Sequence, residues 1–146
     1  MALIDTVRTT QSTKVAHFVF KHDDTMVPKA GGAAVDFGAT NTTATTFVAV
    51  PLPPGAVVVG GYIARTQAFD AATYSITIGD ADDDNRYLAA ADLKAVGTTS
   101  LLTPGYVSTG QNIEVIINAA DACTTGEAIL VVEYIVDGRA DEVQVA

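Results

Sequence analysis

Histidines are the first candidates for a catalytic role, because a serine or cysteine nucleophile needs an imidazole base beside it. The chain offers two, His17 and His22. Side chains five positions apart on a strand point to opposite faces, so these two are poor partners for one nucleophile or one metal ion. Asp23 and Asp24 follow directly, and this HDD sequence predicts a solvated turn at a strand end.

The serines and the single cysteine give no catalytic pattern either. None of the four serines lies in a G-x-S-x-G elbow, and no glycine-rich cradle for phosphates is present. Cys123 is the only cysteine, which excludes an internal disulfide and favours a small buried residue. We predict no catalytic, cofactor-binding or metal-binding residues and a protein that is not an enzyme. A small enzyme with paired carboxylates is an alternative, although no pattern places two acids in one cleft.

The densest acidic segment is residues 80–86, DADDDNR. Asp80, Asp82 and Asp84 occupy the first, third and fifth positions of a calcium loop of the D-x-D-x-D type. The motif then fails, because Asn85 stands where glycine is usual and Ala91 stands where a bidentate glutamate is needed. A bound Ca²⁺ and a solvated acidic hairpin loop both remain open. We favour the solvated loop, because water reduces carboxylate repulsion to about 1 kcal/mol at roughly 4 Å.

The elements that must position these residues are strands. Residues 56–64 and 128–136 are apolar on both alternating faces apart from Glu133, which predicts central strands or strands with a covered second face. The segments with strand-like alternation or composition are 13–20 (TKVAHFVF), 45–50 (TTFVAV), 56–64 (AVVVGGYIA), 73–78 (TYSITI), 111–117 (QNIEVII) and 128–136 (AILVVEYIV).

Turn-forming segments separate these strands, at 30–43, 51–55 (PLPPG), 79–85 (GDADDDN) and 102–105 (LTPG). The only helical candidate is 85–96 (NRYLAAADLKAV), which is rich in Ala and Leu and is followed by Gly97 as a C′ residue; a turn between strands is its alternative. The sequence therefore predicts an all-β fold, an antiparallel, jelly-roll-like β-sandwich with at most one short helix. Residues 1–146 are expected to form a single domain with extended N- and C-terminal ends.

Composition and charge restrict the partners. Hydrophobic residues make up 49% of the chain and charged residues 17%, which is typical of a globular protein. A net charge of -9 with only 8 Lys and Arg argues against nucleic-acid or anionic-membrane binding, since both need a cationic face. There is no apolar run of membrane-spanning length, and residues 1–10 lack the apolar run of a signal peptide. We expect a protein made and kept, or assembled, in a cytoplasm.

Residues 53–97 carry a resemblance to a known family. The stretch PPGAVVVGGYIARTQAFDAATYSITIGDADDDNRYLAAADLKAVG has a Pro-Gly turn, a hydrophobic strand, an aromatic residue and Asp before a second strand, and an Ile-Gly-Asp acidic loop leading to Arg-Tyr-Leu. In this it resembles the small capsid decoration, or cement, proteins of tailed bacteriophages. The run EAILVVEYIVDGRADE at 127–142 is similar to the last strand of such proteins.

The resemblance implies a structural virion protein with a jelly-roll-like subunit and no active site. Such a subunit self-associates as a dimer or trimer and binds the outer surface of the major capsid protein lattice. There, on the exterior of a virion assembled in the host cytoplasm, it fastens neighbouring capsomers once the shell has expanded. An acidic domain suits this exterior better than a DNA-facing lumen. The candidate contact segments are residues 1–10, 51–55, the loop from Asp80 to Arg86, and 137–146.

A second class of function stays open: a phage receptor- or carbohydrate-binding β module, on a head fibre or associated with the tail. Jelly rolls commonly bind sugars, and the tyrosines could supply stacking faces. They are Tyr62, Tyr74, Tyr87, Tyr106 and Tyr134. Aromatic residues make up only 7% of the chain and Trp is absent, which favours the capsid interpretation.

Overall fold

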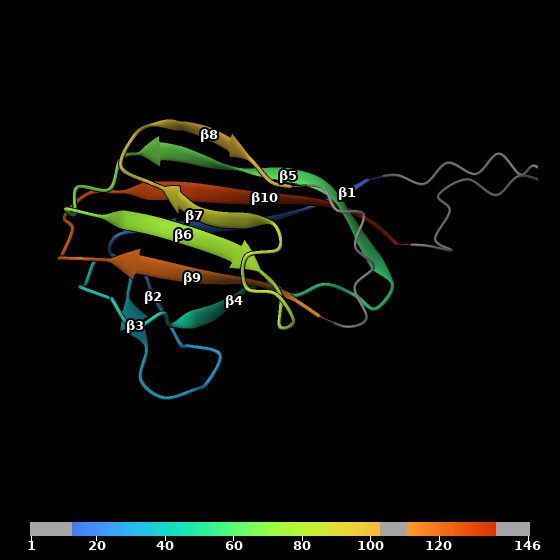
Figure 1. The fold of residues 1–146 in the computed structure, drawn as a ribbon, viewed down its shortest axis with the longest axis horizontal. Coiled ribbons are helices and arrows are strands. Elements are labelled where there is room, and N and C mark those ends of the chain that lie inside the picture. The colour runs from blue at the N-terminus through green and yellow to red at the C-terminus, as the bar shows by residue number, and fades with distance from the viewer. Residues whose placement is uncertain (1–12, 103–110, 137–146) are drawn as a thin grey trace, which may run out of the picture.

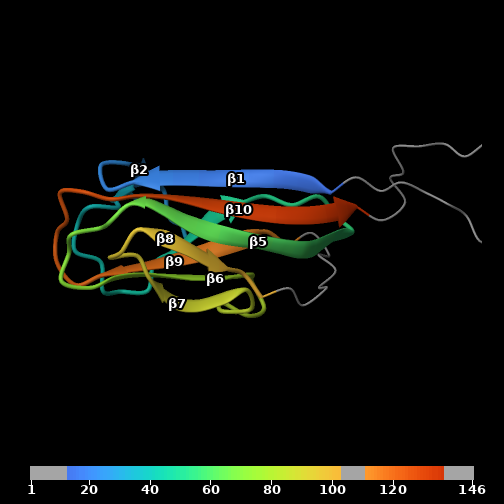
Figure 2. The same cartoon turned by 90° about the horizontal axis from the view of Figure 1, so that it is seen from above.

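The computed structural model describes residues 13–102 and 111–136, which form two four-stranded antiparallel sheets and a two-stranded ribbon (Figure 1). Seen from above, β1, β10 and β5 of one large sheet lie above β6 and β7 of the other (Figure 2). No helix occurs among the described residues. In chain order the strands are β1 Lys14–Lys21, β2 Thr25–Met26, β3 Val35–Asp36, β4 Thr46–Val50, β5 Ala56–Gln67, β6 Tyr74–Gly79, β7 Leu88–Asp92, β8 Gly97–Ser100, β9 Ile113–Ala119 and β10 Glu127–Val136.

The strand order is that of a jelly roll. One sheet runs β1-β10-β5-β8 and the other β4-β9-β6-β7, while β2 and β3 pair only with each other. The pairs β1 with β10, β4 with β9, β5 with β8 and β6 with β7 are nested in the sequence, as when one long hairpin is rolled up. The prediction of an all-β, jelly-roll-like antiparallel sandwich is confirmed.

All six predicted strands are present, as β1, β4, β5, β6, β9 and β10. The helix considered for residues 85–96 is wrong. Tyr87 N donates to Ile78 O at 3.0 Å and Leu93 N donates to Tyr74 O at 2.9 Å, so the segment pairs with β6 as strand β7. Tyr87 and Leu93 are both buried. Pairing and burial with β6 therefore override the helix propensity of the alanines.

Aromatic rings join the two sheets. The ring of Phe37 lies 5.6 Å from that of Phe20 in β1 and 5.2 Å from that of Phe47 in β4, between centroids. Phe69 stacks on Tyr74 with centroids 4.0 Å apart, and the Tyr74 hydroxyl donates to Phe37 O at 2.8 Å. Burial raises the pKa of Tyr74 far above its ordinary value. This core fixes the relative position of the sheets and thus of the loops at each end.

Candidate interaction surface

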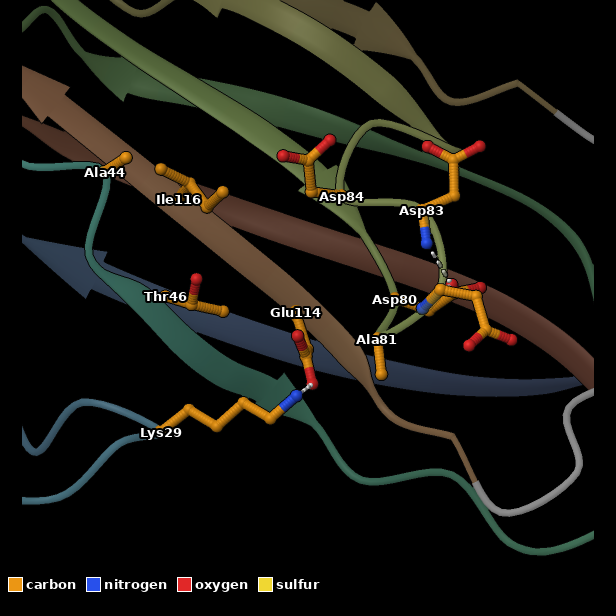
Figure 3. Close-up of a pocket in the computed structure, with 10 residues that line it drawn as sticks. Lys29, Ala44, Thr46, Asp80, Ala81, Asp83, Asp84, Glu114 and Ile116 are labelled. Atoms are coloured by element: carbon orange, nitrogen blue, oxygen red, sulfur yellow. Dashed lines mark hydrogen bonds and ion pairs between the residues drawn. The ribbon is translucent and has the colours of Figure 1, made fainter.

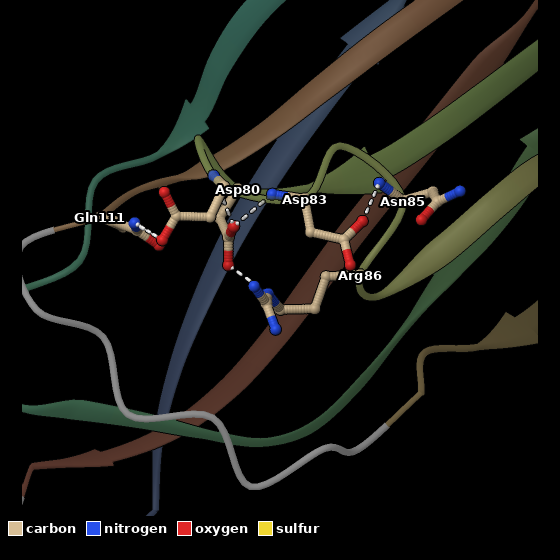
Figure 4. A network of polar contacts seen from close by, with 6 residues as sticks. Asp80, Asp83, Asn85, Arg86 and Gln111 are labelled. Atoms are coloured by element: carbon tan, nitrogen blue, oxygen red, sulfur yellow. Dashed lines mark hydrogen bonds and ion pairs between the residues drawn. The ribbon is translucent and has the colours of Figure 1, made fainter.

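Residues 80–87 form a tightly bonded loop between β6 and β7 (Figure 4). Asp80 is 3% exposed, and its Oδ1 accepts hydrogen bonds from the amides of Asp82 and Asp83, each at 3.0 Å. Its Oδ2 accepts from Arg86 Nε at 2.6 Å. Gly79 begins the loop, and a Cβ there would lie 2.1 Å from Asp83 O. The loop is therefore held in one conformation by Asp80, with Arg86 as its counter-charge.

This geometry weighs against the calcium hypothesis. A calcium loop needs Asp80, Asp82 and Asp84 to turn their carboxylates toward one point. Here the Asp80 carboxylate faces Arg86 and two amides, while that of Asp82 accepts a hydrogen bond from Gln111 Nε2. Within residues 13–102 and 111–136, no three His, Cys, Asp or Glu side chains gather closely enough to hold a metal ion. The geometry therefore favours an acidic loop without calcium, but the loop is not solvated throughout, because Asp80 is buried and paired with Arg86.

An open groove of about 610 Å³ lies between this loop and strands β9 and β4 (Figure 3). Lys29, from the segment between β2 and β3, reaches in and places its Nζ 2.5 Å from Oε1 of Glu114 in β9. Glu114 is only 8% exposed, so Lys29 compensates a nearly buried carboxylate. Asp82, Asp83 and Asp84 line the same groove. Its net character is acidic, which suits a cationic side chain of a partner protein.

The predicted contact segments that the structure describes come together at one end of the sandwich. Gln111 bonds to Asp82 in the acidic loop, and the next residue, Asn112, accepts a hydrogen bond at Oδ1 from Leu52 N at 3.1 Å. Residues 111 and 112 thus tie loop 80–87 to turn 51–55. We call this the loop end: residues 51–55, 80–87 and 111–112.

The start of β1 and the end of β10 also lie at the loop end. Lys14 at the start of β1 pairs with Tyr134, and Val136 at the close of β10 pairs with Ala56, directly after turn 51–55. The predicted contact segments 1–10 and 137–146 lie outside the described residues.

The opposite end of the sandwich has its own carboxylate link. Asp70, after β5, accepts hydrogen bonds from Thr124 Oγ1 and Thr124 N, both at 2.7 Å, and from Thr125 N at 3.1 Å. The Thr124 side-chain bond, aided by the two amides, lowers the pKa of Asp70 from 3.8 to about 2. The bonds join the β5–β6 loop to the β9–β10 loop.

The other residues that the sequence analysis considered for catalysis or metal binding lie at separate places in the fold. His17 is exposed on β1, whereas His22 is partly buried after the strand, so the predicted opposite orientation is confirmed. Asp23 and Asp24 lie in an exposed turn, as predicted. Cys123 is buried, also as predicted, and burial raises the pKa of its thiol.

The tyrosines offer little stacking surface for a sugar. Tyr74 and Tyr87 are each 1% exposed, and Tyr134 packs against the core. Of the four tyrosines that the structure describes, Tyr62 is the most open, at 39% exposure; Tyr106 lies outside the described residues. Tyr74 and Tyr87 are therefore not available to stack on a sugar.

Sequence reasoning did not identify Lys29, Glu114, Gln111 or Asn112 as parts of a surface. Lys29 and Glu114 are 85 positions apart in the chain, and no local pattern signals their contact. Arg86, in contrast, lies within the acidic segment itself, where a cation among aspartates indicates internal neutralisation.

No helix among the described residues has the length and hydropathy needed to cross a membrane.

No protein-family model matches the sequence, and no curated protein sequence matches it significantly. In three dimensions the chain is similar to a chain of the cyanophage Pam1 capsid asymmetric unit, with TM-score 0.61 and 20% identity over 93% of this chain and 92% of that chain. It is also similar to a chain of the acidic stable capsid structure of Helicobacter pylori bacteriophage KHP30, with TM-score 0.62 and 21% identity over 94% and 98%. At these identities the likeness shows a shared fold.

Proposed function

We propose that this protein is a structural component of a tailed-phage virion that binds the outer surface of the major capsid protein lattice. In this role it fastens neighbouring capsomers and stabilises the expanded head. It acts by binding and not by catalysis, and it self-associates.

The observation that carries the proposal is the extent of the structural match. The chain matches 92% and 98% of the lengths of two chains from phage capsid structures, so the likeness spans whole subunits of similar size. The sequence resemblance to phage cement proteins, carried by residues 53–97 and 127–142, supports the same capsid role independently of the structural match.

The loop end is the surface that we assign to the capsid. It unites turn 51–55 and loop 80–87, two of the segments chosen as contacts from the sequence. Because Asp80 and Arg86 hold the loop in one conformation, little ordering is needed when it binds. Its exposed aspartates would face cationic side chains of the capsid protein.

The proposed mechanism is thermodynamic. A subunit that binds only the expanded lattice stabilises that lattice by mass action. A self-associated protein that touches several capsomers gains effective concentration for each later contact, so weak individual contacts suffice.

The direct test is co-sedimentation of the purified protein with capsids that lack it, in unexpanded and expanded form. Saturable binding to expanded capsids alone is expected. Failure to bind either form would refute the proposed role, and equal binding to both would refute the stabilising mechanism.

A further inference from the structure

The four edge strands of the two large sheets differ in how well they could accept another strand. Among the described residues, these edges are β1, β8, β4 and β7. β8 has 4 residues, and β4 and β7 have 5 each with a break in register; β7 also contains Ala90 at φ 37°. β1 has 8 residues in unbroken register with β10. It is therefore the longest and most regular open edge.

The free backbone groups of β1 can be assigned. His22 N donates to Gly126 O at 3.0 Å, which continues the β1–β10 register and places the even-numbered residues in hydrogen bonds with β10. Odd-numbered residues therefore direct their N–H and C=O to the open edge. Lys21 is already satisfied there, since its N–H donates to Asp24 Oδ2 at 2.8 Å and its C=O accepts from Asp24 N at 3.2 Å.

The residues left with outward-directed backbone groups are Val15, His17 and Val19. Their side chains share the outer face of the sheet, where Val15 is 53% and Val19 50% exposed. In a chain of net charge -9, β1 carries Lys14 and Lys21 and no acid. Two copies can therefore approach along this edge without carboxylates of β1 facing each other.

We infer that β1 pairs antiparallel with β1 of a second copy of this chain, with the twofold axis at His17. His17 then lies opposite the second copy's His17, and Val15 lies opposite the second copy's Val19. This register pairs the three open residues with one another and forms about six backbone hydrogen bonds. An axis one residue away in either direction would set Val19 opposite Thr13, which precedes the paired residues of β1, or Val15 opposite the already satisfied Lys21.

The side chains that would lie opposite each other are compatible with this contact, and the surface area that it covers indicates how strong it is. The two Val15–Val19 pairs cover apolar surface on the outer face, and each Lys14 lies opposite a phenylalanine, Phe20, and not another lysine. A paired edge roughly 23 Å long and 10 Å thick covers only about 230 Å² per copy, far below the roughly 800 Å² of a standard interface. The isolated dimer is therefore weak, and attachment of both copies to one surface would strengthen it.

The edge of β1 is thus the proposed surface for self-association, and in this respect the inference rests on the proposed function. Its tests use the purified chain alone, so their failure would leave capsid binding, measured separately, untouched.

The first test is site-directed cross-linking with His17→Cys, Val15→Cys and Val19→Cys. A hydrogen-bonded antiparallel pair has Cα atoms about 5.5 Å apart, within the range of a disulfide. Equivalent cysteines at position 15, or at position 19, would be separated by about four residues, or roughly 13 Å, which no disulfide spans. Mild oxidation should therefore link only His17→Cys into dimers. The unsubstituted chain, whose Cys123 is buried, is the control.

The second test compares two variants by sedimentation equilibrium. Val15→Asp with Val19→Asp places like charges opposite each other twice, whereas Val15→Asp with Val19→Lys places opposite charges there. The first variant should dimerise roughly tenfold more weakly than the second. Equal association of the two variants, a monomeric unsubstituted chain at millimolar concentration, or equal cross-linking at positions 15, 17 and 19 would overturn the inference.

Discussion

Arg86 Nε lies 2.6 Å from Asp80 Oδ2, and the side chain of Asp80 is 2% exposed. A nearly buried carboxylate is thus neutralised six residues along the same loop. The pair, together with the bonds from the amides of Asp82 and Asp83 to Asp80, explains how a segment with four aspartates is held in one conformation.

Replacing Asp80 should destabilise the fold. Asp80→Ala removes the partner of Arg86 and leaves the amides of Asp82 and Asp83 unpaired, so the free energy of unfolding should fall by about 2–3 kcal/mol in urea denaturation. The matched control is Asp84→Ala at an exposed position, which should change it by less than about 0.5 kcal/mol. Equal effects of the two substitutions would show that the loop is not organised by Asp80.

The acidic loop should not bind calcium. Because the Asp80 carboxylate is committed to Arg86 and two amides, millimolar Ca²⁺ should produce no heat in calorimetric titration and no change in melting temperature. A saturable heat that is lost in Asp82→Asn would contradict this and restore the calcium interpretation.

Acid should weaken the link between the two loops at the Asp70 end. The folded-state pKa of Asp70 is about 2, below its ordinary value of 3.8. Its contribution is therefore complete above about pH 4 and lost as pH falls through the folded pKa. Between pH 4 and pH 2 the melting temperature should fall less steeply in Asp70→Asn than in the unsubstituted chain. Asp84→Asn is the control, and identical slopes for Asp70→Asn and the unsubstituted chain would argue against the link.

Charge reversal at the loop end should weaken capsid binding. Asp84 is exposed and lines the acidic groove, whereas Asp23 is exposed at the opposite end of the sandwich. Asp84→Lys and Asp23→Lys change the net charge equally. Only Asp84→Lys should lower the affinity for expanded capsids, by about threefold to tenfold, in co-sedimentation at moderate salt. A larger effect of Asp23→Lys would place the contact at the other end.

The sequence was most informative where the alternation of apolar and polar residues matches the alternation of buried and exposed positions in a strand. Tyr74, Ile76 and Ile78 alternate with polar residues and are all buried in β6, so this strand could be predicted from the pattern alone. The segment that includes β7 could not be, because its alanines favour a helix and only pairing with β6 decides otherwise. β2 and β3 have 2 residues each, too few for any periodicity.

The candidate surface also has parts that the sequence indicates and parts that depend on the three-dimensional topology. Turn 51–55 and loop 80–87 stand out from composition, but their meeting through Gln111 and Asn112 depends on the rolled-up topology. The open edge of β1 is likewise a property of the sheet order. The sequence alone shows that β1 is a strand but does not show that it lies at an edge.

The central claim, a capsid-bound structural role, is tested most directly by counting copies. Quantitative mass spectrometry of purified virions of the phage that, under the proposed function, encodes this chain would give its ratio to the major capsid protein. We predict a ratio near one, or a simple fraction of it, as expected of a protein that covers the whole lattice. Absence from the particle, or only a handful of copies, would contradict the account and point to a tail-associated or non-virion role.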